Sequence, residues 1–139
     1  MLFRSLALYR RLYKPSVRHP EPHATVCVWA LAAETQDEAL HHSLGRERWR
    51  VERERGVLGP LQASDVIAAR GFSAAERPTV DAMRRKAFVG TGAQVGRQLR
   101  ALAEELQLDE LVVNTWAHEP AVRRTSYALL AREFGLGGT

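Results

Sequence analysis

The chain has 139 residues, of which 45% are hydrophobic and 26% are charged, and its formal net charge is +4. This length suits one domain, residues 1 to 139, and the composition excludes a disordered or low-complexity chain. Its 20 basic residues are nearly all arginines that alternate with glutamates, which does not favour nucleic-acid binding. No apolar run approaches the roughly 20 residues that span a bilayer, so we expect a cytoplasmic protein without a membrane partner.

The first third of the chain predicts a helix, a linker and a strand. Apolar residues three or four positions apart predict an amphipathic helix that ends before Pro15, and the prolines that follow predict an extended connection. The run ATVCVWALAA, residues 24 to 33, is rich in β-branched and small apolar residues and predicts a strand covered on both faces. Its cysteine, Cys27, has no intrachain partner and is expected to be a buried thiol.

The next segment predicts a long helix followed by an insertion. Thr35 and Glu38 have the spacing of a capping box, which predicts a helix over about residues 36 to 55. The stretch RERWRVERER within it has arginines and glutamates four positions apart, which we expect to decorate a solvated surface. We interpret about residues 45 to 72 as an insertion that adds about one helical turn after the long helix.

The last half of the chain alternates between helices and short strands. A second capping-box spacing, from Ser73 to Glu76, predicts a helix that runs through about Lys86. The apolar run AFVG then precedes a helix whose expected N-cap is Thr91. The stretch DELVVNTW predicts a third strand, and a closing helix is expected to begin near Pro120.

This alternation predicts an α/β fold with parallel strands. Three parallel strands leave two unpaired edges, so we interpret the chain as the last three or so β/α units of a partial (β/α)8 TIM barrel. A doubly wound sheet is the alternative. Its Gly-rich phosphate turn is not matched, because the glycines of GTGAQVG do not have the required spacing.

The sequence also resembles a known family. The stretch FVGTGAQVGRQLRALAEELQLDELVVNTW is similar to the C-terminal segment of the luciferase-like, flavin-dependent monooxygenases. ALYRRLYKPS and HATVCVWALAAETQDEA resemble the units that precede that segment in the same family. The resemblance runs over residues 1 to 134 and implies roughly the last two-fifths of the family's (β/α)8 barrel.

The resemblance implies an oxidoreductase that uses reduced FMN, or a deazaflavin in some members, with dioxygen to oxidise a small organic substrate. A flavin reductase is then a candidate partner. The family's main flavin-binding and catalytic residues come from earlier strands, so no catalytic residue is assigned and the chain is not expected to be active alone. The alternative is a non-catalytic interaction module that pairs through its strand edges with a second copy or with a complementary half-barrel.

The polar end of the last strand holds the first candidate site. Asn114, Thr115 and Trp116 would lie at the carboxyl end of a barrel strand, where barrels place their active sites. The candidates are Gly90, Thr91 and Asn114 for the cofactor, and Trp29, Thr115, Trp116 and His118 for the substrate pocket. Packing, capping or a surface position is the alternative role for each. No metal site is expected, because the adjacent His41 and His42 point in different directions on a helix.

Overall fold

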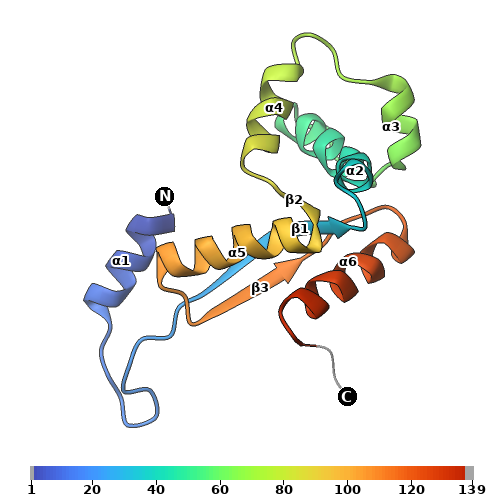
Figure 1. Cartoon of the computed structure of the whole chain (residues 1–139). Coiled ribbons are helices and arrows are strands. Elements are labelled where there is room, and N and C mark those ends of the chain that lie inside the picture. Colours follow the sequence, from blue (N-terminus) through green and yellow to red (C-terminus); the bar gives the residue numbers. More distant parts are fainter. Residues whose placement is uncertain (1, 137–139) are drawn as a thin grey trace.

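The computed structural model of the chain describes residues 2–136, so both ends of the expected domain lie outside the described residues. The elements in chain order are α1 (Leu2–Leu12), β1 (Thr25–Ala33), α2 (Gln36–Glu54), α3 (Ser64–Arg70), α4 (Arg77–Arg85), β2 (Phe88–Thr91), α5 (Gly92–Leu106), β3 (Glu110–Asn114) and α6 (Pro120–Glu133). The expected α/β class with a parallel sheet is confirmed (Figure 1). No helix in the described part is long and apolar enough to cross a membrane.

The strand order of the sheet differs from the expected one. The order is β2-β1-β3, whereas three consecutive barrel units would place β2 in the middle. The expectation of three consecutive units is therefore wrong for β2. The pairing gives the reason: β3 pairs with β1 from Thr25 to Trp29, while the short β2 pairs only from Ala30 to Ala33. The two strands thus flank different halves of β1.

Helices α5 and α6 cover one face of the sheet (Figure 1). Ala30 and Ala32 of β1 pack there against Val95 and Leu99 of α5 and Leu130 of α6, and all five side chains are buried. Small residues on the strand let the two helices approach closely, and larger aliphatic side chains from the helices fill the space between them. This face holds the main hydrophobic core.

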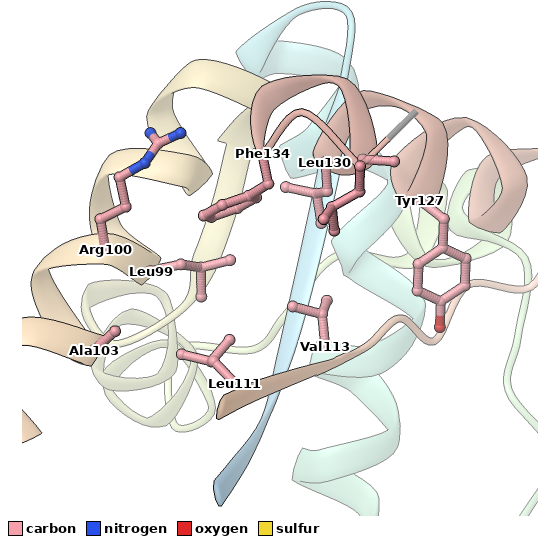
Figure 2. A pocket seen from close by; sticks show the side chains of 10 residues that line it. Leu99, Arg100, Ala103, Leu111, Val113, Tyr127, Leu130 and Phe134 are labelled. Atoms are coloured by element: carbon pink, nitrogen blue, oxygen red, sulfur yellow. The ribbon is translucent and has the colours of Figure 1, made fainter. Parts of the chain in front are cut away.

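The packing of α5, β3 and α6 leaves one apolar hollow (Figure 2). It has a volume of about 410 Å³, and Leu111 and Val113 of β3 form its floor. Phe134 lies at its rim, where the Arg100 guanidinium carbon stands 4.7 Å from the ring centroid. Arg100 also pairs with Glu133 at 2.7 Å, which joins α5 to the end of α6.

The opposite face of the sheet is covered only at its carboxyl end. Leu31 and Ala33 pack there with Ala39 of α2, but the register partners Cys27 and Val112 are exposed. The expectation of a buried Cys27 in a strand covered on both faces is therefore wrong. The physical reason is that no described element packs over the amino-terminal half of this face.

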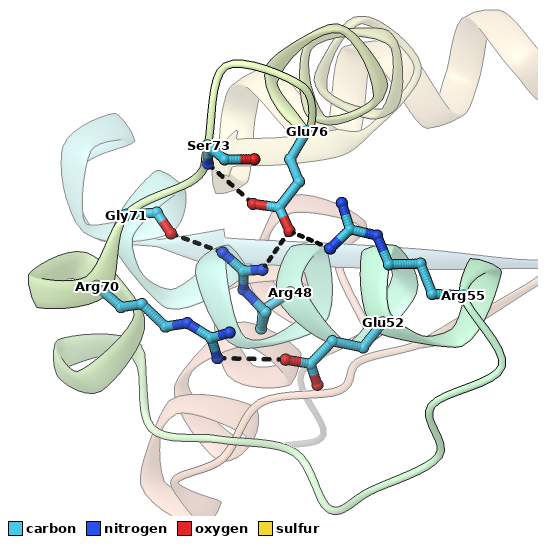
Figure 3. A network of polar contacts seen from close by, with 7 residues as sticks. All are labelled: Arg48, Glu52, Arg55, Arg70, Gly71, Ser73 and Glu76. Atoms are coloured by element: carbon cyan, nitrogen blue, oxygen red, sulfur yellow. Dashed lines mark hydrogen bonds and ion pairs between the residues drawn. The ribbon is translucent and has the colours of Figure 1, made fainter.

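Helices α2, α3 and α4 form an arm that is held together by buried charges (Figure 3). The expectation that RERWRVERER only decorates the surface is wrong for Glu47 and Arg48, which are 6% and 2% exposed. Arg48 donates to Glu76 Oε1 at 2.8 Å and to the carbonyl oxygen of Gly71 at 2.6 Å. Arg84 of α4 pairs with Glu47 at 2.7 Å. The helix α3 is also longer than the single turn that was expected.

The turn before α4 differs from the predicted capping box. The helix begins at Arg77, and Ser73 does not cap it. Instead, the backbone N–H of Ser73 donates to the Glu76 carboxylate at 2.9 Å, so the carboxylate closes a turn (Figure 3). This bond, reinforced by Arg48, lowers the pKa of Glu76 from 4.5 to about 2. Because the Glu76 carboxylate accepts hydrogen bonds from several donors, it remains charged at neutral pH.

The other predicted helix starts are confirmed. Thr35 caps α2 in a reciprocal capping box with Glu38. Thr91 caps α5 in the same way, with Gln94 as its partner. Pro120 occupies the first turn of α6, where its missing N–H leaves no helix bond unmade. These signals act over a few residues, so the local sequence is enough to predict them.

Candidate functional site

The middle of β1 and the carboxyl end of β3 bring two of the candidate residues together. Trp29 and Asn114 are register partners, so their side chains lie on the same face of the sheet. This is the face that carries the exposed Cys27. Arg46 of α2 reaches over Trp29, with its guanidinium carbon 4.0 Å from the ring centroid. A cation held over an indole face is attracted by the ring's negative face, which fixes both side chains.

This corner contains buried side-chain nitrogens that have no hydrogen-bond partner among the described residues. Trp29 Nε1, His42 Nδ1 and Arg46 Nε are all buried and have no hydrogen-bond partner among the described residues. Burial and, to a smaller extent, the neighbouring charge of Arg50 lower the pKa of Arg46 to about 10, against a smaller opposite effect of Glu47. Buried polar atoms are nearly always paired in folded proteins, so an unpaired group near a surface marks a candidate ligand contact.

Thr115 has a structural position. It is only 3% exposed, and its hydroxyl donates to the carbonyl oxygen of Ala30 at 2.7 Å. Beside it, the hydroxyl of Ser126 accepts from the backbone N–H of Ala32 at 2.9 Å. These two hydroxyls satisfy the backbone of β1 beyond the last residue of β3, where strand pairing stops. Thr115 thereby joins β1, β3 and α6.

Trp116 separates two hollows at the carboxyl end of β3. Each has a volume of about 430 Å³, and both are lined in part by Arg123 of α6. Trp116 is 40% exposed and packs edge-to-face on Trp49 of α2, with ring centroids 5.3 Å apart. His118 lines the second hollow and pairs with Glu119 at 3.0 Å in an exposed position. Asn114 lines the first hollow, so the structure brings Asn114, Trp116 and His118 into one region.

Gly90 and Thr91 lie across β1 from this region. They pair with Ala32 and Ala33 on the β2 side, whereas Asn114 belongs to the strand on the other side. The Thr91 hydroxyl accepts from the N–H of Gln94 in the helix cap. A Cβ atom at Gly90 would lie 2.5 Å from the side-chain oxygen of Gln94, so the glycine leaves room for this cap. The structure therefore does not bring Gly90 and Thr91 next to Asn114.

Sequence reasoning missed the contribution of α2 to this region. His42 and Arg46 lie one turn apart, and Arg50 follows after one more turn, so the three share one stripe of the helix. That spacing was visible in the sequence. The stripe was missed because Arg46 and Arg50 fell inside the segment interpreted as an insertion. In the described residues, no group of three or more His, Cys, Asp or Glu side chains could hold a metal ion.

Comparison with known proteins finds relatives that match most of this chain. No protein-family model matches it. It is 30% identical over 129 residues to a protein of Escherichia coli strain K12 described as a luciferase-like monooxygenase. Over this span the chain is similar to a luciferase-like monooxygenase. The uncharacterised protein YwcH of Bacillus subtilis strain 168 is 29% identical to it over 127 residues.

The match spans only part of each luciferase-like relative. It covers 93% of this chain and 38% of the Escherichia coli protein, and 91% and 38% in the comparison with YwcH. These shares are consistent with the C-terminal portion of a luciferase-like protein. The crystal structure of apo-MsnO8 has the same fold over 99% of this chain and 43% of its own, with a TM-score of 0.82 at 23% identity.

Proposed function

We propose that this chain forms part of a flavin-dependent luciferase-like monooxygenase that oxidises a small organic molecule with dioxygen. The observation that carries the proposal is the 30% identity to a luciferase-like monooxygenase along 93% of the chain. The position of Asn114 at the carboxyl end of β3 supports it, because enzymes built on parallel barrels act at the carboxyl ends of their strands.

The uncovered face of the sheet agrees with a barrel. In the proposed arrangement, β1 and β3 are neighbouring barrel strands, and β2 is a short addition beside the end of β1. The face with Cys27 and Val112 would then point into the barrel, whose interior is normally filled by side chains from other strands. The other strands of the barrel would correspond to the part of the relatives' sequences that this chain does not match.

The residues at this corner fit one side of a flavin ring. The ring edge carries carbonyl oxygens and ring nitrogens, and Trp29 Nε1 is a buried donor without an acceptor. The exposed amide of Asn114 lies on the neighbouring strand and can both donate and accept. When bound, reduced FMN would supply the electrons for the reaction with dioxygen. Trp29 and Asn114 would orient the ring, and Trp116 would shield it from water.

A matched pair of tryptophan variants tests this proposal. In a titration of FMN followed by flavin fluorescence, Trp29→Phe should weaken binding about fivefold, the effect of one lost hydrogen bond of about 1 kcal/mol. Trp49→Phe should leave binding unchanged, because the Trp49 indole N–H already donates to the Gly59 carbonyl. The proposal fails for this chain if the wild type does not bind FMN, or if both variants weaken binding equally.

A further inference from the structure

Another hollow, which has a basic lining, lies between α2 and α4. This α2–α4 groove has a volume of about 520 Å³, and the residues that matter here are Arg46, Arg50, Glu54, Thr79, Met83 and Lys86. Three of these side chains are cations and one is a carboxylate. The groove therefore carries an excess of positive charge within a small volume, which attracts anions.

The cations of this groove differ from four other arginines of the arm. Arg48, Arg55, Arg70 and Arg84 each have a carboxylate oxygen within 2.7 to 3.5 Å. Among the described residues, Arg46, Arg50 and Lys86 form no ion pair. The carboxylate of Glu47, the nearest candidate for Arg46, is already bonded by Arg84 and by the hydroxyl of Ser43. Carboxylates thus pair with those four arginines, although Arg48 Nε also has no partner among the described residues, and none pairs with the three cations of the groove.

Arg46 has a buried hydrogen-bond donor that the described residues leave unpaired. Its Nε is buried without a partner, although its guanidinium is fixed over the Trp29 ring. Burial and the charge of Arg50 lower its pKa to about 10, which means that its charged form is disfavoured in this surrounding. A bound anion would reverse both effects, since it would accept from the guanidinium and offset the repulsion between Arg46 and Arg50.

We propose that the α2–α4 groove binds a phosphate or sulfonate group of a small ligand, held by Arg46, Arg50 and Lys86. The two guanidinium groups present planar sets of donors that suit a tetrahedral oxyanion, and the Thr79 hydroxyl adds a donor. Met83 provides an apolar wall for the organic part of the ligand. Because Arg46 also contacts Trp29, the anion lies next to the candidate flavin site. The proposal does not depend on the flavin function.

Inorganic phosphate is a direct probe, with Arg50→Gln and Arg53→Gln as matched variants. Both arginines are exposed on α2, and both changes remove one positive charge, but Arg53 lies beside Trp49 and outside the groove. In calorimetric titrations with the ionic strength held constant by chloride, wild type and Arg53→Gln should bind phosphate equally. Arg50→Gln should bind about tenfold more weakly, the loss expected for one charge-assisted contact. Lys86→Gln should show the same direction of effect.

Two results would overturn the inference. One is the absence of phosphate binding to the wild type, and the other is an equal loss in Arg53→Gln, which would indicate attraction by net charge alone. Competition of FMN and of riboflavin with phosphate then identifies which molecule carries the anionic group that the groove holds. If FMN displaces phosphate and riboflavin does not, the groove holds the phosphate of the cofactor. If neither displaces it, the groove holds the anionic group of a separate ligand. Both of these results keep the groove as an oxyanion site.

Discussion

Glu76 is the residue on which the α2–α4 arm depends most. It accepts from the backbone N–H of Ser73, from the buried Arg48 and from the more exposed Arg55. Its sequence neighbours give no sign of this role, because Arg48 lies 28 positions earlier in a stretch that reads as a solvated helix face. An alternating pattern of arginine and glutamate looks the same whether it is exposed or buried. The buried ion pair could therefore not be predicted from the sequence.

The lowered pKa of Glu76 makes the stability of the fold depend on pH. Its carboxylate stabilises the folded chain fully above its ordinary pKa of 4.5, and this stabilisation is lost as the pH falls through about 2. Glu76→Gln should therefore lower the unfolding temperature at neutral pH and flatten its decline between about pH 5 and pH 2. Thermal unfolding followed by circular dichroism at several pH values measures both effects.

Glu105→Gln serves as the control for this experiment. Glu105 is exposed on α5 and has no ion pair among the described residues. This variant should keep the wild-type decline. If Glu76→Gln and Glu105→Gln follow the same pH profile, the contacts of Glu76 do not contribute to stability in the way described here.

Among the elements, α2 has the most demanding position. It packs on β1 and β2, and it carries Arg48 and Glu47, two buried members of the ion-pair network. The loop that leads to α3 also crosses it. The loop passes so close that a Cβ atom at Gly45 would lie 2.6 Å from the backbone carbonyl oxygen of Gln62. A glycine in the middle of a helix normally weakens it, so this glycine is explained by the crossing.

Gly45→Ala should therefore destabilise the protein by about 1–3 kcal/mol, the usual cost of overpacking. Helix propensity alone predicts the opposite sign, since alanine is favoured over glycine by about 1 kcal/mol. Gly96→Ala in α5 is the comparison, because a Cβ atom there meets the side chain of Glu133, which can move, and not backbone. Urea unfolding measures both changes. A Gly45→Ala protein that is more stable than wild type would contradict the close crossing.

The limits of prediction at the level of elements follow from distance along the chain. The caps at Thr35 and Thr91 were predictable because donor and acceptor lie three positions apart. The strand order was not predictable, because it depends on which half of β1 each later strand pairs with. The candidate site shows the same difference between features that depend on the local sequence and contacts that depend on distant segments. Asn114 was selected by its place at a strand end and Trp29 as a residue inside the first strand, whereas the contact between Trp29 and Arg46 needed the packing of α2.

At the scale of the whole molecule, the sheet has two unequal faces. Val26 lies on the face covered by helices and is 8% exposed, whereas Val112 lies on the open face and is 42% exposed. Val26→Thr should cost about 1–3 kcal/mol, because it buries a hydroxyl without a partner. Val112→Thr should change stability by less than about 0.5 kcal/mol. Urea unfolding of the two variants compares the faces directly, and equal costs would mean that the second face is covered in solution.

The central position of β1 also determines when the protein can fold during its synthesis. Residues 25 to 33 are made early, but their partners in the sheet, residues 88 to 91 and 110 to 114, are made much later. The arm of α2, α3 and α4 lies between them in the sequence, and its helix α2 packs on both β1 and β2. Contacts between distant segments form slowly, because a long loop must close first. The strand that carries Trp29 therefore completes its pairing only after residue 114 has emerged from the ribosome.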